Sequence, residues 1–168
     1  ILAACGIRVV TYNFMPLLDW TRTDLAWELP DGARALRFDP VAFAAYDLFL
    51  LRRPGAEADH DDATRAAAER YFAAMDDTAR TYLERTILAG LPGSETTFTS
   101  AQFLAAIATY ADIDHATLRD NHVAFLAAVC PLADELGISL VVHPDDPPFA
   151  IFGLPRIVST EADVADLF

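Results

Sequence analysis

Residues with chemically useful side chains follow an apolar run late in the chain. Ile138–Val142 leads directly into His143, and Asp145 and Asp146 follow within a few positions. Imidazole and carboxylate groups bind Mn, Fe or Zn, and they also serve as general acids and bases. This pattern predicts either a metal ligand supported by carboxylates or a general acid–base pair.

The same residues also fit an ordinary loop, in which His143 follows a strand and the two aspartates form a solvated turn. A single imidazole does not make a metal site, because catalytic sites take several protein ligands. The other histidines lie elsewhere: His60 opens a helix, His115 lies in a first turn, and His122 lies mid-helix beside an apolar face. We expect their side chains to be at the surface or half-buried.

A second polar group lies near the start of the chain. Asn13 follows an apolar run, and Trp20 and Arg22 come soon after. Arg22 could bind a substrate carboxylate through two N–H groups, or it could form a local ion pair with Asp19 or Asp24. The indole of Trp20 could shield a bound ligand or pack within a lid.

Both polar groups follow apolar, β-branched runs, which predict strands at 7–12 and 138–143. Their lack of alternation is typical of strands buried on both faces of a parallel sheet. Ligands bind at the carboxyl ends of such strands. We therefore expect an α/β fold with a long helical insertion at 13–136, a loop at 144–158 and the start of a helix at 159–168.

Local signals divide the insertion. Asp31–Gly32 predicts the turn of a hairpin, and Asp39 caps a helix that begins with proline. His60–Ala89 shows helical spacing throughout, with a stop signal at Gly90–Gly93. Further helix starts are indicated by two residues, Thr99 and Asp114.

The composition excludes several classes of function. The 168 residues carry a net charge of −13, and all twelve basic residues are arginine. The absence of lysine rules out Schiff-base chemistry and a P-loop, and the acidic surface argues against nucleic acid or membrane partners. No apolar run is long enough for a membrane-spanning helix. Like Arg22, Arg156 could bind a substrate carboxylate or form a local ion pair.

The two cysteines, Cys5 and Cys130, form no metal-binding pair, and we expect reduced core thiols in a cytoplasmic protein. The chain begins at Ile1 rather than methionine, and its last expected helix ends at Phe168 without a C-cap. We therefore expect a single partial domain, 1–168, from a longer protein.

Three stretches resemble the mannonate dehydratase family: Tyr12–Asp24, His143–Pro148 and Gly153–Thr160. Asp31–Asp39 and Arg53–Ala56 match the intervening segment of that family in the same order. The resemblance covers nearly the whole chain, and several long matches in register are more specific than one short motif.

This resemblance implies that the chain is part of a TIM (β/α)₈ barrel of the xylose-isomerase-like type. It implies dehydration of D-mannonate, a small anionic sugar acid, to 2-dehydro-3-deoxy-D-gluconate in hexuronate (glucuronate) catabolism. It also implies Fe(II) or Mn(II) as cofactor and a homo-oligomer for the full-length protein.

The family's site residues transfer only in part. His143 matches a metal ligand, and the remaining ligands, a Cys, a His and an Asp, would come from strands after Phe168. Asp145 and Asp146 would then have catalytic roles, orienting the ligands. Three residues would face the sugar acid: Asn13, Trp20 and Arg22.

Two alternatives remain open at this stage. A related metal-dependent sugar isomerase or epimerase could share the histidine at a strand end. A non-catalytic α/β module could instead bind a partner through its surface helices. Because most metal ligands would be missing, we expect the 168-residue piece alone to be inactive.

Overall fold

The computed structural model describes residues 1–89 and 98–167. Its first sheet pairs two segments that lie far apart in the sequence. Strands β1 (Val9–Tyr12) and β4 (Ser139–Val142) run parallel, with Val9 opposite Ser139 and Tyr12 opposite Val142. The α/β class and the parallel pair are thus confirmed, although each strand is shorter than the sequence predicts.

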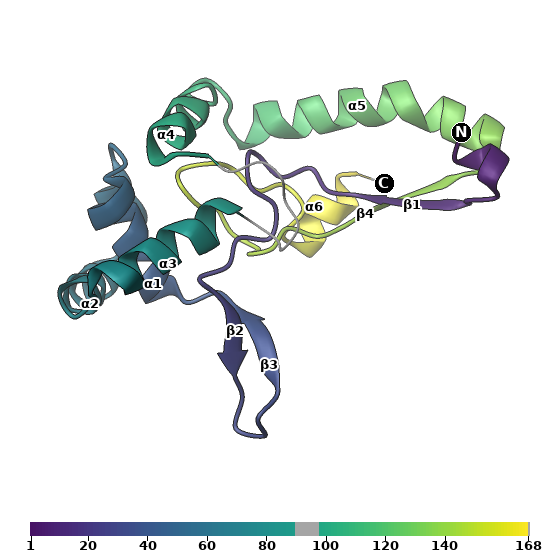
Figure 1. Cartoon of the computed structure of the whole chain (residues 1–168). Helices are drawn as coiled ribbons and strands as arrows, with labels where there is room; N and C mark the ends of the chain where they lie inside the picture. Colours follow the sequence, from purple (N-terminus) through teal and green to yellow (C-terminus); the bar gives the residue numbers. More distant parts are fainter. Residues whose placement is uncertain (90–97, 168) are drawn as a thin grey trace.

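The prediction that these strands are buried on both faces is wrong. Exposed and half-buried residues alternate along β1 and β4, and Val9 and Val141 are 59% and 45% exposed. Helix α5 (His115–Leu136) runs beside the pair (Figure 1) and packs on one face. Nothing within the described part of the chain covers the other face to the same extent.

Helix α5 begins and ends where its sequence signals indicate. The side chain of Asp114 accepts a hydrogen bond from the Thr117 amide at 2.8 Å, which satisfies one of the free N–H groups of the first turn. Gly137 ends the helix in the left-handed conformation (φ 63°). The turn after it leads directly into β4.

Two shorter helices also start at capping boxes. Thr99 and Gln102 form the one before α4 (Ser100–Ala108), as the sequence predicts. Thr160 caps α6 (Glu161–Ala165). The expected final helix is therefore present, but it is shorter than 159–168.

The segment expected as one long helix, His60–Ala89, consists of two helices. Helix α2 (Asp62–Ala73) ends before Met75, and α3 (Asp77–Ala89) follows. Asp76 accepts a hydrogen bond from the Ala79 amide at 2.8 Å, and this cap starts a new helix despite continuous apolar spacing. The predicted stop at Gly90–Gly93 lies outside the described residues.

Asp39 caps α1 (Pro40–Ala45) by accepting hydrogen bonds from two backbone amides, as predicted. The helix then widens into a π-helix, η2 (Tyr46–Leu51), instead of continuing in α form. A short 3₁₀ turn, η3 (Ala56–Asp59), follows it, and another, η1 (Ala3–Cys5), precedes β1. π-Helices are rare and cluster near functional sites.

The predicted hairpin is confirmed. Strands β2 (Asp24–Glu28) and β3 (Arg34–Arg37) pair antiparallel, and Gly32 occupies the turn with a φ of 83°. Figure 1 shows the hairpin projecting away from the rest of the chain. The guanidinium of Arg37 lies 3.8 Å above the ring of Trp27.

The largest hydrophobic core joins the insertion to the 144–158 loop. It contains Phe43, Ile87, Phe103 and Phe152, all nearly inaccessible to solvent. A smaller cluster beside the strand ends joins Leu118 of α5 to residues of the 144–158 loop and its flank. The loop therefore contacts both cores. None of the helices in the described residues is long and apolar enough to cross a membrane.

Candidate active site at the strand ends

The carboxyl ends of β1 and β4 bring the two predicted polar groups together. The His143 amide donates a hydrogen bond to the Tyr12 carbonyl at 2.8 Å, which continues the parallel ladder by one residue. The segment after β1 carries Trp20 and Arg22, and the segment after β4 carries His143 and Asp146. We call these four residues the strand-end cluster.

His143 has a defined hydrogen-bonding partner for one ring nitrogen. Its Nδ1 lies 2.6 Å from the Pro144 carbonyl and 3.3 Å from the indole nitrogen of Trp20. A single Nδ1 atom cannot donate to the carbonyl and accept from the indole at once. The shorter contact assigns the proton to Nδ1, donating to Pro144, which leaves the lone pair on Nε2.

Trp20 packs against the edge of this imidazole. The ring centroids are 5.1 Å apart and the ring planes are inclined by 80°, an edge-to-face arrangement that aromatic rings favour. The backbone of Trp20 is left-handed (φ 30°), as is that of Leu17 (φ 60°). Such conformations are rare for residues with side chains, so the turn is held by its surroundings.

Arg22 binds the segment after β4 through a bidentate contact with Asp146. Its Nη1 donates to Asp146 Oδ1 at 3.0 Å and its Nη2 donates to Asp146 Oδ2. Nη1 also donates to the Thr21 carbonyl at 2.9 Å. The predicted local pair with Asp19 or Asp24 is therefore wrong, because the partner of Arg22 comes from the distant loop.

Asp145 is placed differently from its neighbour Asp146. Its side chain is 5% exposed, and Oδ2 accepts hydrogen bonds from the Val158 amide at 2.6 Å and the Ser159 hydroxyl at 2.9 Å. Its own amide donates to the Val158 carbonyl. Asp145 thus closes the 144–158 loop, whereas Asp146, with 37% of its side chain exposed, lies in the cluster.

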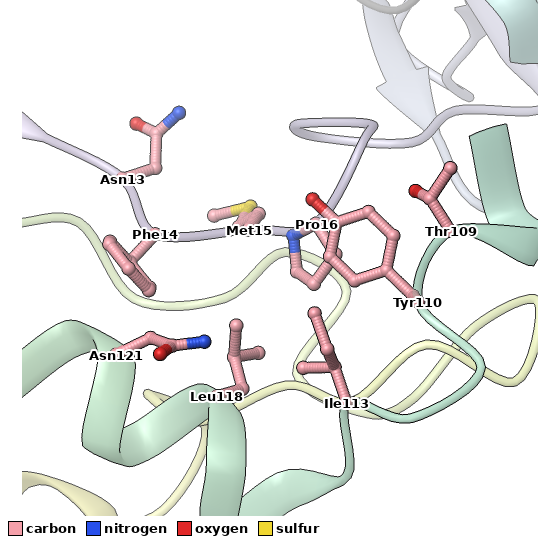
Figure 2. Close-up of a pocket in the computed structure, with 9 residues that line it drawn as sticks. All are labelled: Asn13, Phe14, Met15, Pro16, Thr109, Tyr110, Ile113, Leu118 and Asn121. Atoms are coloured by element: carbon pink, nitrogen blue, oxygen red, sulfur yellow. The ribbon is translucent and has the colours of Figure 1, made fainter.

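Asn13 lines a neighbouring pocket of about 470 Å³ between the segment after β1 and helix α5. In Figure 2, Phe14 points toward Asn121 of α5, whereas the Asn13 amide points to the other side of the chain. Within the described residues, no hydrogen bond joins the Asn13 side chain to the strand-end cluster.

The sequence did not indicate how deeply His122 is buried. Its side chain is inaccessible to solvent, its Nε2 lies 2.8 Å from the Tyr12 hydroxyl, and its ring stacks on Phe14 at 4.4 Å. Burial lowers the pKa of His122, and the nearby charge of Asp145 opposes this shift. The prediction of a surface or half-buried side chain is therefore wrong.

His60 is half-buried, as predicted. It lies 3.1 Å from Asp47, which is fully buried and also binds Arg53. These three side chains form an ion cluster within the insertion, remote in sequence from the strand ends. His115 is exposed, as predicted, and approaches Asp163 at 3.6 Å.

The metal-ligating groups of the described residues do not form a complete site. No three His, Cys, Asp or Glu side chains in residues 1–89 and 98–167 are grouped closely enough to hold an ion. The cysteines are free; Cys5 is exposed and Cys130 half-buried, so the expectation of core thiols is wrong. His143 fits as one ligand, because Nε2 is available and Nδ1 is anchored to a carbonyl, as in many metal-bound histidines.

Comparison with known proteins places this geometry in a family. The family model described as D-mannonate dehydratase (UxuA) matches residues 1–168. The chain belongs to the D-mannonate dehydratase family. This membership confirms the resemblance carried by the strand-end segments.

Individual members of the family support the same assignment. A mannonate dehydratase of Chromohalobacter salexigens is 61% identical over 163 residues, covering 97% of this chain and 42% of the relative. Mannonate dehydratase 1 of Agrobacterium fabrum is 52% identical over 166 residues, covering 99% and 41%. The chain thus spans about two fifths of the length of the curated relatives it matches.

The fold is also similar to a solved structure. The crystal structure of mannonate dehydratase from Streptococcus suis serotype 2 aligns with a TM-score of 0.57 and 30% sequence identity. The alignment covers 99% of this chain and 35% of that chain.

Proposed function

We propose that the protein carrying this chain removes water from D-mannonate to give 2-dehydro-3-deoxy-D-gluconate, a step of hexuronate catabolism. The observation that carries the proposal is the family match over residues 1–168. The segments that follow β1 and β4, which carry the resemblance, meet at the strand ends. The reaction breaks the C2–H and C3–O bonds, so the site must accept one proton and donate another.

We further propose that β1 and β4 are neighbouring strands of a TIM barrel. Their parallel pairing and the position of the strand-end cluster at their carboxyl ends fit that architecture, in which active sites lie at this face. The insertion between them would then lie outside the ring of strands.

Fe(II) or Mn(II) is the proposed cofactor, with His143 Nε2 as one ligand and the others from outside the described residues. A bound ion would act as a Lewis acid that stabilises negative charge on the substrate. The chain's own contribution is to orient the imidazole, because the Pro144 carbonyl holds Nδ1–H and Trp20 limits ring rotation.

Arg22 and Asp146 are proposed to bind and orient the sugar acid. The Asp146 carboxylate fixes the guanidinium plane, and donors of Arg22 that Asp146 does not use are available for the substrate carboxylate. Asp146 is the more accessible of the two aspartates and is the one we propose for proton exchange with substrate. Asp145 shapes the loop, and Asn13 borders the polyol side.

A chimera tests this proposal. This chain replaces the matching segment of the Chromohalobacter relative, and the product is assayed for formation of the 2-dehydro-3-deoxy acid with Mn(II). We expect turnover in the chimera, loss of both turnover and Mn(II) binding in His143→Ala, and neither loss in the exposed control His115→Ala. The proposal fails if the chimera isomerises hexuronates instead, or if His143→Ala retains Mn(II) affinity.

A further inference from the structure

Arg156 is a buried cation between the two segments that form the site. Its side chain is 4% exposed, and Nη2 donates to the Leu18 carbonyl at 3.1 Å. Nε and Nη1 have no hydrogen-bond partner in the described part of the chain. Buried, unpaired donors destabilise a fold, so stability alone does not account for an arginine here.

The charges around Arg156 come from both segments. Burial lowers the pKa of its guanidinium, and the negative charges of Asp145, Asp19 and Asp146 oppose that shift. Asp19 lies after β1, whereas the other two aspartates lie after β4. The positive charge therefore attracts both segments toward each other.

The backbone that Arg156 contacts is the turn that carries Trp20. Leu18 is 6% exposed and belongs to the main core, and its carbonyl lies between the left-handed residues Leu17 and Trp20. A turn with two such residues needs outside contacts to persist. Arg156 supplies one of them through its hydrogen bond to Leu18.

We propose that Arg156 is a positioning residue that fixes the Leu17–Trp20 turn and thereby holds Trp20 against His143. A lysine would keep the charge, but its single ammonium group lacks the planar fork that reaches the carbonyl from a fixed direction. The consequence for catalysis rests on the proposed function, whereas the Trp20–His143 contact can be tested without it.

The test uses fluorotryptophan-labelled chimera and ¹⁹F NMR, with the Trp20 signal assigned by its loss in Trp20→Phe. His143→Ala should shift this signal, because it removes the imidazole edge beside the indole. In an Arg156→Lys background, we expect the same His143→Ala change to produce no shift. The control Arg119→Lys, which weakens ion pairs between α5 and α6, should leave the shift intact.

A second readout is the Mn(II) affinity of the chimera. We expect Arg156→Lys to weaken it by about 10- to 100-fold, the range for residues that orient a metal ligand, and Arg119→Lys to leave it unchanged. The proposal would be overturned if His143→Ala shifted the Trp20 signal equally in the chimera that keeps Arg156 and in the Arg156→Lys variant. A chimera that fails to dehydrate mannonate but shows the expected shifts would instead overturn only the proposed function.

If Arg156→Lys does not fold, chemical labelling of the unsubstituted chimera decides. We expect phenylglyoxal to modify the exposed Arg52 and to spare Arg156. Equal modification of both would show that Arg156 is not enclosed between the segments, and would contradict the proposal.

Discussion

Two buried charges, one in the insertion and one beside the candidate site, differ in how many partners they have. Asp47 in η2 is inaccessible to solvent and binds both Arg53 and His60. Among residues 1–89 and 98–167, Arg156 beside the strand ends has a single carbonyl partner, and its Nε and Nη1 have none. The buried charge of Asp47 is therefore satisfied by nearby partners, whereas Arg156 keeps buried donors that packing alone does not explain.

The two regions also differ in how much of their apolar surface is buried. Aromatic rings fill the core between the insertion and the 144–158 loop, where Phe103 lies 5.0 Å from Phe152 and Phe43 lies 4.7 Å from the same ring. The sheet of β1 and β4 has one face with exposed valines. The dense aromatic core thus lies apart from the proposed site, and residues of the 144–158 loop contact both the core and the strand ends.

The largest effect should come from emptying the insertion core. Phe103→Ala removes a ring that is fully buried, and we expect it to lower the free energy of unfolding by about 4 kcal/mol. Val141→Ala in β4 should cost about 0.5 kcal/mol or less, because that side chain is already exposed. Urea unfolding of the chain measures both, and equal costs would break the comparison.

A slightly smaller loss is expected from the buried ion cluster. Asp47→Asn removes the carboxylate charge and leaves Arg53, 8% exposed, with the more exposed Asp59 as its remaining ionic partner, which should cost about 3 kcal/mol. The matched control is Asp62→Asn, whose pair with Arg65 is solvent-exposed and should contribute about 0.5 kcal/mol. Unfolding curves that barely separate Asp47→Asn from the control would contradict this view of the insertion.

The strand-end region should show an acid sensitivity that depends on His122. Because burial lowers the pKa of His122 below its ordinary value of 6.5, the unfolded chain takes up this proton first. The stabilisation is therefore present above pH about 6.5 and is lost as the pH falls. His122→Phe should lose less stability than the parent between pH 7 and 5.

Tyr12→Phe serves as the matched control for that pH dependence. It removes the hydrogen bond to His122 but keeps the imidazole and its pKa shift, so it should retain the acid sensitivity. Thermal unfolding across the pH range measures both variants. If the stability of His122→Phe and of the parent changed equally with pH, the acid sensitivity would come from groups other than His122.

The smallest effect on stability is expected within the cluster itself. Asp146→Asn weakens the contact with Arg22, but the carboxylate is more than one third exposed, so the loss should be below about 1 kcal/mol. In the chimera the same substitution should strongly reduce turnover, because Asp146 orients Arg22. A large loss of stability with little change in turnover would reverse the roles assigned to the two regions.

Sequence reasoning succeeded where the cause is local. The caps at Asp39, Thr99 and Asp114 and the turn at Gly32 depend on a few neighbouring residues, and all are present. The helix break at Asp76 is also local, but continuous apolar spacing concealed it. The family signature was readable because its residues are contiguous in the sequence.

The features that sequence reasoning missed depend on distant partners. Arg22 pairs with Asp146, 124 positions away, and no local pattern indicates that choice over Asp19 or Asp24. His122 is buried because α5 packs on the sheet of β1 and β4 and brings its ring against Tyr12 and Phe14. Its spacing from Leu118 and Phe125 already placed it on one helix face. The roles proposed for the strand-end residues remain predictions for the chimera to test.

The pairing of β1 with β4 also has a consequence for the order of folding. β1 finds its partner only after the whole insertion has been synthesised, so this contact closes a very long loop and should form slowly. The helices of the insertion depend on local hydrogen bonds and can form earlier, but their core is completed only when Phe152 packs into it. We expect the strand-end cluster to be among the last parts to assemble, together with this part of the core.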